Sequence, residues 1–201
     1  MGLRFSYTLL SPVYDAIVAS PTQEIRKTSL QRINSTEPQN ILVNGIGTGL
    51  DIPYLPPQHN YSATDLTPAM LHKCQQRLNQ HNLTMQLHNA DVMSLPFAEH
   101  QFDIVIMHLI LAVVPQPELA LNEAIRVLKP GGKIYILDKF IKQGHTAPLR
   151  RFLNIFLRHI ATRTDVVFED LLNQNTQLEL LSDKPALLGG WFRLIDLRKL
   201  K

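Results

Sequence analysis

Three glycines on alternate positions, Gly45, Gly47 and Gly49, have the spacing in this sequence that most clearly points to chemistry. They follow the apolar run 41–43, which is typical of a buried strand, and a short helical segment begins near Leu50. A glycine turn lets the backbone approach a ligand that a Cβ atom would keep away, and a helix N-terminus attracts negative charge. The pattern therefore predicts a site for a nucleotide-type cofactor at the end of a strand.

The same spacing discriminates between cofactors. Counted from Gly45, the dinucleotide fingerprint G-x-G-x-x-G requires its last glycine at position 50, which is Leu50. The third glycine falls one residue earlier, at Gly49. This argues against a nicotinamide-dependent oxidoreductase, which remains the less favoured alternative.

Two aspartates end the next two expected strands. Asp65 lies 20 residues after Gly45, where a carboxylate can accept hydrogen bonds from both hydroxyls of a ribose. Asp91 can accept from an adenine amino group, while Val92 supplies an apolar edge. The alternatives are a helix-capping or turn aspartate for Asp65, although Thr67 is the better cap, and a solvated turn residue for Asp91. Because carboxyl ends of parallel strands line the ligand crevice, we expect both aspartates in the site.

His108 is the candidate general base. It ends a nearly continuous apolar strand over 102–109, and we expect it to face the same crevice. The alternative is a histidine whose hydrogen bonds are satisfied inside the core. The other seven histidines are scattered without a spacing such as H-E-x-x-H, so we predict no metal site.

The elements that must position these residues alternate between strands and helices. The expected strands are 40–46, 61–66, 85–91, 102–109, 133–140, 178–181 and 191–197, and the expected helices are 4–33, a short one at Pro53, one from Pro68, 117–129, 147–160 and 166–174. This alternation predicts an α/β fold, a Rossmann-like doubly wound sheet with helices on both faces. The last two strands are joined too closely for a crossover helix, so we expect an antiparallel C-terminal hairpin and a single domain over 1–201.

Composition sets the broad class. The chain has 201 residues, 45% of them hydrophobic and 18% charged, with a net charge of only +3 and no strongly basic tail, so nucleic acid is not implied. A single cysteine, Cys74, excludes an internal disulfide and suits a reducing compartment. No secretory signal is visible and the longest apolar run, 104–114, is too short to span a bilayer, so we expect a cytoplasmic protein.

Four stretches, taken in order, resemble successive motifs of the class I S-adenosylmethionine-dependent methyltransferases: ILVNGIGTGLDIPYLP, ATDLTPAML, NADVMSLPFAEHQFDIVIM and ALNEAIRVLKPGGKIYILDKF. The resemblance covers about residues 5–140 and is strongest to the subgroup of quinone-biosynthesis (UbiE-like) and phospholipid N-methyltransferases. It implies S-adenosylmethionine as cofactor. The absence of an N-P-P-Y-like run after residue 107 favours a small-molecule or lipid acceptor, such as an amine, a quinol or a thiol.

The resemblance also implies the site. The glycines would pass the methionyl part of the cofactor, Asp65 would hold the ribose, and the backbone near Met107 would meet the ammonium group. The implied cofactor-binding set is Asn44, Gly45, Gly47, Gly49, Asp65, Leu66, Asp91, Val92, Met107 and His108. Residues 1–33 resemble a helical lid over the core of 34–201, and Tyr14 of this lid joins His108 as a candidate catalytic residue.

Asn44 departs from the family pattern, which usually has Asp or Glu at this position. The amide keeps an oxygen acceptor but loses the charge that balances the ammonium group, and we expect binding to weaken by about 1–2 kcal/mol. This residue motivates the alternative of an S-adenosylmethionine- or nucleotide-binding module without methyl transfer, regulatory or part of an assembly.

The segment 149–160 is basic and amphipathic. Two interpretations stay open. The helix rests on an anionic membrane and gives access to a lipid acceptor, or it packs its Leu/Phe face on the sheet and leaves its arginines in water.

Overall fold

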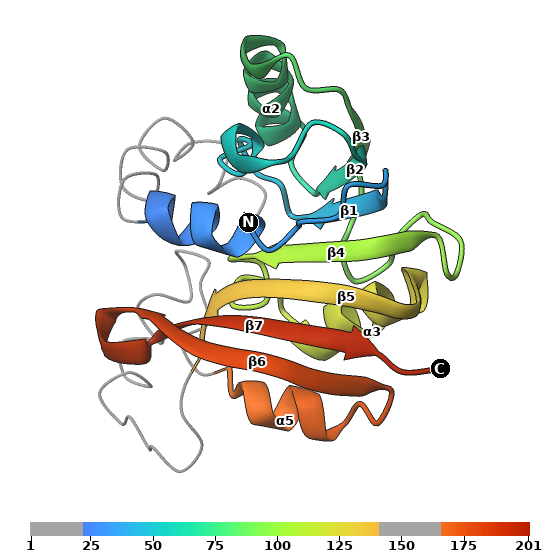
Figure 1. The fold of residues 1–201 in the computed structure, drawn as a ribbon, viewed down its shortest axis with the longest axis vertical. Coiled ribbons are helices and arrows are strands. Elements are labelled where there is room, and N and C mark those ends of the chain that lie inside the picture. The colour runs from blue at the N-terminus through green and yellow to red at the C-terminus, as the bar shows by residue number, and fades with distance from the viewer. Residues whose placement is uncertain (1–21, 141–165) are drawn as a thin grey trace.

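The computed structural model describes residues 22–140 and 166–201 (Figure 1). The strands are β1 (Asn40–Asn44), β2 (Asn60–Asp65), β3 (Met85–Asn89), β4 (Phe102–His108), β5 (Leu128–Lys139), β6 (Leu178–Leu187) and β7 (Phe192–Lys199). The helices are residues 22–30, η1 (Ile52–Tyr54), α2 (Pro68–His81), α3 (Pro117–Val127), α5 (Phe168–Asn173) and η2 (Leu188–Gly190). All seven strands form one sheet in the order β3-β2-β1-β4-β5-β7-β6.

The sheet is parallel from β3 to β5 and antiparallel beyond it. β1 pairs in parallel with β2 and β4, and β4 pairs in parallel with β5. β7 then runs antiparallel to both β5 and β6. The expected α/β fold with an antiparallel C-terminal hairpin is therefore confirmed.

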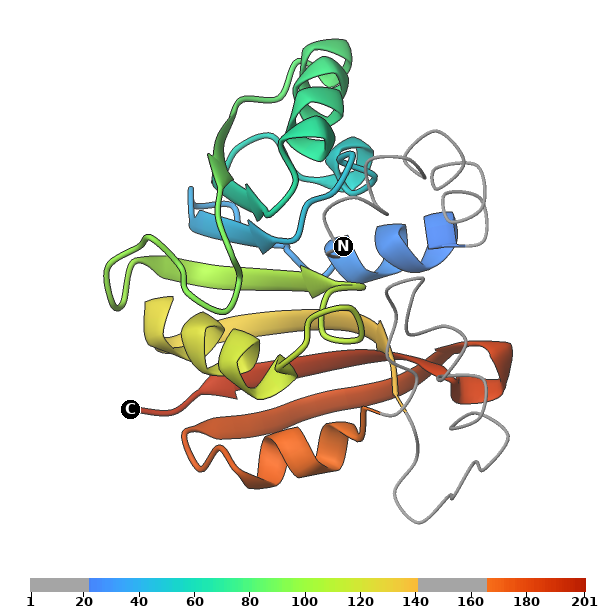
Figure 2. The same ribbon diagram turned by 180° about the vertical axis from the view of Figure 1, so that it is seen from behind.

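Helices cover both faces of the sheet, as Figures 1 and 2 show from opposite sides. Successive strand residues point to opposite faces, so Ile41 packs with Leu30 of the N-terminal helix and Leu78 of α2, on one face. Leu42 packs on the other face in a cluster that includes Leu121 of α3 and residues of α5. The carboxyl ends of β1 to β4 thus meet at one edge between two packed layers.

Helix starts follow the prolines closely, whereas two strands are longer than expected: β5 starts at Leu128 instead of 133, and β6 ends at Leu187 instead of 181. Pro53 lies in the first turn of η1, and α2 and α3 begin at Pro68 and Pro117. β1 ends at Asn44 instead of residue 46, because Gly45 adopts a φ of +68° that leaves the extended region. β6 continues past Pro185 to Leu187, which an edge strand tolerates because the missing N–H leaves no inner ladder broken.

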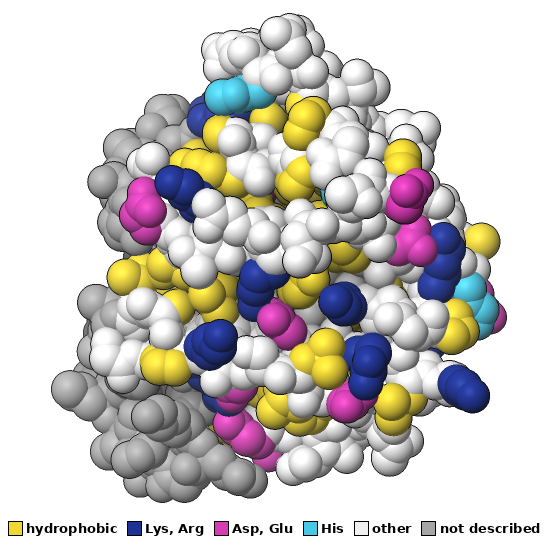
Figure 3. Space-filling model, in the orientation of Figure 1, with side chains coloured by type: hydrophobic (Ala, Val, Ile, Leu, Met, Phe, Trp, Pro, Cys, Tyr) yellow, Lys and Arg dark blue, Asp and Glu magenta, His cyan; other side chains and the backbone are white. Residues whose placement is uncertain are grey.

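Charged side chains of both signs are mixed over the face that Figure 3 presents. Among the described residues, oppositely charged side chains also pair with each other, as Arg32 does with Asp196 and Arg198 with Glu179. The face in view therefore has no large area of one sign.

Some expectations fall outside the described residues. These are the helix over 147–160, the helical segment up to residue 21, and Tyr14. Within 22–140 and 166–201, no helix is long and apolar enough to cross a membrane.

Candidate functional site

The turn after β1 has the conformation that its glycines allow. Gly45, Gly47 and Gly49 have φ values of +68°, +57° and +84°, a region that other residues rarely adopt. A Cβ atom on Gly45 would lie 2.5 Å from Cδ1 of Ile110, and one on Gly49 would lie 2.5 Å from Cδ1 of Ile52. A Cβ atom on Gly47 would meet nothing within 4 Å. A side chain at Gly45 or Gly49 would therefore displace Ile110 or Ile52, whereas Gly47 faces open space.

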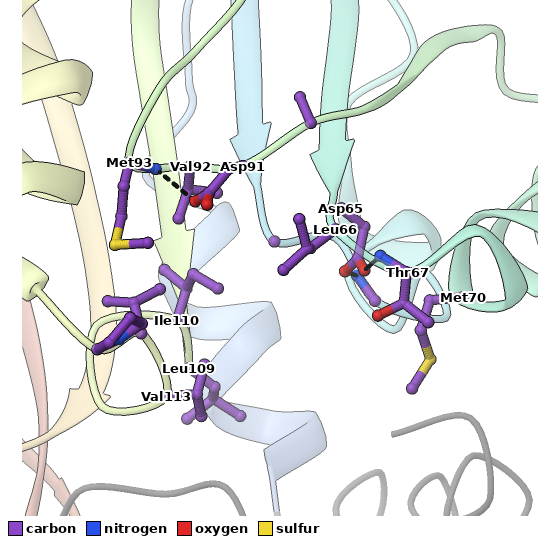
Figure 4. A pocket seen from close by; sticks show the side chains of 15 residues that line it. Asp65, Leu66, Thr67, Met70, Asp91, Val92, Met93, Leu109, Ile110 and Val113 are labelled. Carbon is purple, nitrogen blue, oxygen red and sulfur yellow. Dashed lines mark hydrogen bonds between the residues drawn. The ribbon is translucent and has the colours of Figure 1, made fainter. Parts of the chain in front are cut away.

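A pocket opens beside this turn, at the carboxyl edge of the sheet (Figure 4). Its walls come from the turn after β1, the ends of β2 and β3, and the segment between β4 and α3. The lining residues are Gly45, Gly47, Asp65, Leu66, Thr67, Met70, Ala90, Asp91, Val92, Met93, Leu109, Ile110, Val113, Val114 and Pro115. Six members of the expected set are thus brought together: Gly45, Gly47, Asp65, Leu66, Asp91 and Val92.

Asp65 connects the end of β2 with the glycine turn. Its Oδ2 accepts a hydrogen bond from the backbone N–H of Gly47 at 2.9 Å, and its Oδ1 accepts one from Thr67 at 2.8 Å. Burial raises the pKa of Asp65, although these amide bonds favour the charged form. Thr67 is the N-cap residue of α2, as expected, but its side chain makes no capping hydrogen bond. Asp65 is therefore a turn aspartate that also lines the pocket, and a carboxylate has acceptor positions left for a ligand.

Asp91 has a similar local role at the end of β3. Its Oδ1 accepts a hydrogen bond from the backbone N–H of Met93 at 2.9 Å, which orients the turn that follows the strand (Figure 4). Val92 is buried beside it and contributes an apolar surface to the pocket. The pair offers one acceptor group and one apolar wall to the same ligand.

Four members of the expected set do not line the pocket: Asn44, Gly49, Met107 and His108. Met107 is fully buried in the core on the α3 side of the sheet. Asn44 is buried as well, and its Oδ1 accepts a hydrogen bond from the Thr64 hydroxyl at 3.1 Å. Its Nδ2 has no hydrogen-bond partner among the described residues. The Asn44 oxygen is thus already engaged with the protein.

The expectation that the His108 ring faces the crevice is wrong. Strand alternation places its side chain on the face covered by the N-terminal helix, where Nε2 lies 2.8 Å from Oγ of Ser29. Nδ1 lies 2.9 Å from Oδ1 of Asp51, and Arg26 donates to the same oxygen at 2.7 Å. Burial alone would raise the pKa of Asp51, but the charges and hydrogen bonds of His108 and Arg26 together hold it well below its usual range. The geometry supports the alternative of a histidine satisfied in the core.

The sequence alone did not single out two buried aspartates, Asp51 and Asp138, that hold segments beside the pocket. Asp51 lies two residues after Gly49, but its partners Arg26 and His108 lie 25 and 57 residues away. Asp138 is buried at the end of β5 and accepts a hydrogen bond from the backbone N–H of Ala112 at 3.1 Å. Asp138 ends a strand, as Asp65 does, so the same rule on strand ends could have predicted it from the sequence.

Within 22–140 and 166–201, no three His, Cys, Asp or Glu side chains are grouped to hold a metal ion.

Comparisons with known proteins agree with this geometry. Residues 42–136 match a family model described as a methyltransferase domain. Over 190 residues the chain is 24% identical to the phosphatidylethanolamine N-methyltransferase of Cereibacter sphaeroides, and the match covers 93% of both chains. Over 76 residues it is 40% identical to the ubiquinone/menaquinone biosynthesis C-methyltransferase UbiE of Roseobacter denitrificans, covering 37% of this chain and 30% of that protein.

A solved structure supports the fold. The YcgJ protein from Bacillus subtilis superposes with a TM-score of 0.74 at 15% identity, covering 89% of this chain and 99% of that one. At this identity the likeness shows the architecture alone, while the domain match and the curated relatives are similarities in sequence. The matched methyltransferase domain over residues 42–136 and the named methyltransferase relatives together support an S-adenosylmethionine-dependent methyltransferase.

Proposed function

We propose that the chain transfers a methyl group from S-adenosylmethionine to a small-molecule or lipid acceptor, and that the amine of a phospholipid headgroup is the first choice. A phosphatidylethanolamine N-methyltransferase matches along 93% of its length, which supports a lipid amine. A quinol is the second choice, because the match to UbiE spans only 30% of that protein. A thiol is the third.

One observation carries the proposed cofactor position. The glycine turn, the Asp65 carboxylate and the Asp91 carboxylate all line one pocket, and Asp65 contacts the turn at Gly47 N–H over 2.9 Å. The residues fit the cofactor: Asp65 would accept from the ribose hydroxyls, and Asp91 with Val92 would frame the adenine. The open side of Gly47 would leave room for the methionyl part.

The protein's part in the reaction is positioning. When bound, the cofactor supplies a sulfonium-activated methyl group, so in-line placement of the acceptor provides much of the rate. Both ring nitrogens of His108 are engaged with Ser29 and Asp51, and the ring must give up one of these bonds before it accepts a proton. We therefore propose that His108 holds the N-terminal helix against β4 and takes no part in proton transfer.

Calorimetric titration tests cofactor binding. We expect S-adenosylmethionine and S-adenosylhomocysteine to bind with micromolar affinity, and no binding at high micromolar concentration would refute the proposal. Gly47→Ala should abolish binding, because the methyl group enters the pocket and φ is +57°. Gly131→Ala is the matched control: its φ is +77° and its Cβ atom would also meet nothing within 4 Å, but it lies outside the pocket.

Radiolabelled methyl transfer then identifies the acceptor. Vesicles that contain phosphatidylethanolamine, a demethylated quinol and a panel of small thiols form three arms, and we expect label in the lipid amine. Including or omitting anionic lipid in the vesicles tests the proposed membrane contact of residues 149–160.

The second candidate function is a binding module without methyl transfer. Asn44 favours it, because the amide carries no charge and its oxygen is bonded to Thr64. Tight cofactor binding with no label on any acceptor would support this function over methyl transfer.

A further inference from the structure

The segment 109–115 between β4 and α3 forms one wall of the pocket. Leu109, Ile110, Val113, Val114 and Pro115 all line it, and Ile110 packs so closely on the glycine turn that Gly45 has no space for a Cβ atom. The segment reads Leu-Ile-Leu-Ala-Val-Val-Pro, so none of its side chains can hydrogen-bond. Within the segment, the backbone N–H groups of Val113 and Val114 donate to the carbonyl of Ile110, and groups from elsewhere in the chain hold Leu109 and Ala112.

The end of β5 supplies these groups. The backbone N–H of Leu109 donates to the carbonyl of Leu137 at 2.7 Å, and Leu109 itself adopts a φ of +57°. The N–H of Ala112 donates to Oδ2 of Asp138 at 3.1 Å, while Oδ1 of Asp138 accepts from Lys139 N–H at 2.8 Å. Asp138 is 1% exposed, so its carboxylate accepts hydrogen bonds from backbone amides inside the protein and not from water.

The surroundings of Asp138 make its charge costly. Burial raises its pKa to about 6, although the amides of Lys139, Ala112 and Leu111 and the charge of Lys139 favour the anion. Arg193 pairs with it in register on β7, but this guanidinium forms ion pairs with Asp183 and Glu169. The segment 109–115 has no titratable side chain.

We infer that Asp138 is a positioning residue for the cofactor: its carboxylate holds the segment 109–115 against the glycine turn and so sets the affinity of the pocket. The inference rests on the proposed cofactor position. A neutral side chain at 138 would be cheaper to bury, but it would offer fewer acceptors to the amides that shape the wall.

Titration of S-adenosylhomocysteine into Asp138→Asn tests the inference. At pH 7.5 we expect the dissociation constant to rise about tenfold relative to the unsubstituted protein, which corresponds to the loss of one charge-assisted hydrogen bond. Asp103→Asn is the matched control, because Asp103 also accepts a backbone hydrogen bond, from Asn40 at 2.9 Å, and does not line the pocket. Its dissociation constant should change less than twofold.

The pH dependence separates positioning from a general loss of stability. Because protonated Asp138 resembles asparagine, the ratio of the two dissociation constants should fall from about ten at pH 7.5 toward one at pH 5, with a midpoint near pH 6. A ratio that stays constant with pH would overturn the inference.

Hydrogen exchange of the ligand-free protein gives a second readout that needs no variant. Between pH 7.5 and pH 5, the amides of 109–114 should lose protection relative to Ile106 of β4, after correction for intrinsic rates. Unchanged protection, or equal affinity of Asp138→Asn at pH 7.5, would overturn the role of Asp138 and leave the cofactor position standing. Absence of binding by the unsubstituted protein would overturn both.

Discussion

At the scale of single residues, a buried charge cluster decides how the glycine turn is held. Asp51 is the common partner of Arg26 and His108, and the side chains of Asp51 and Arg26 are 4% and 7% exposed. The three residues come from the turn after β1, the N-terminal helix and β4. Because a buried charge is costly without its partner, each residue depends on the others.

Asp51→Asn should therefore be strongly destabilising. We expect the free energy of unfolding at pH 7 to fall by about 3–5 kcal/mol, because the Arg26 charge stays buried without its counter-charge. The folded pKa of Asp51 lies below the unfolded value of 3.8, so its contribution is present above about pH 4 and is lost as pH falls below it. Urea unfolding at a series of pH values measures both effects.

The control is Glu179→Gln, which breaks an ion pair with Arg198 in which both side chains are more than 40% exposed. It should cost less than about 1 kcal/mol. Equal losses for Asp51→Asn and Glu179→Gln would contradict the structural role of the cluster.

Asn44→Asp tests the departure from the family pattern. A carboxylate at this position restores the charge opposite the cofactor's ammonium group, and we expect calorimetry to show binding about tenfold tighter. The same change should lower the stability of the ligand-free protein, because residue 44 is 1% exposed and the charge would be desolvated. Asn60→Asp, exposed at the start of β2, should alter neither property. Weaker binding by Asn44→Asp would contradict the proposed position of the ammonium group.

At the scale of elements, the C-terminal end of α3 is closed by a distant strand. The last carbonyls of a helix have no hydrogen-bond partner within the helix. Here Nζ of Lys199, on β7, donates to the backbone carbonyl of Ile125 at 2.7 Å and to that of Leu128 at 2.8 Å. Lys199 is buried, so the packing of α3 on the sheet and the closure of the hairpin support each other.

Lys199→Met should separate the charge from the packing. The methionine keeps most of the apolar stem but removes the donors, and we expect a loss of about 1–3 kcal/mol in the free energy of unfolding. Thermal and urea unfolding measure it, with the exposed Lys133→Met as control. An unchanged midpoint for Lys199→Met would show that α3 needs no such capping.

At the scale of the whole molecule, the pocket draws its walls from four strand ends of one sheet. A ligand there binds only the folded chain, so it should stabilise the protein by about 2.7 kcal/mol at a hundredfold excess over its dissociation constant. For a chain of this length that corresponds to about 5–10 °C in Tm. Differential scanning fluorimetry with S-adenosylhomocysteine should show this increase, and Gly47→Ala should show none. An equal shift in both would place the ligand elsewhere.

The sequence by itself determined the order of the elements and six of the residues that line the pocket. Prolines at 53, 68 and 117 marked helix starts, and the glycine turn with Asp65 and Asp91 was visible because its chemistry is local to each strand end. Local backbone preferences and the alternation of strands and helices are written in neighbouring residues, so they can be predicted without knowing what packs where.

Only the tertiary structure decided which polar groups are already engaged. His108 meets Ser29 across 79 residues of sequence, Asp138 meets Ala112 across 26, and Asn44 meets Thr64 across 20. These partners are set by the face on which each side chain lies and by the helix packed over that face. A buried polar group forms hydrogen bonds with the groups that the packing of distant segments places beside it. The acceptors that stay free for a ligand in the pocket are those left over from such long-range pairs.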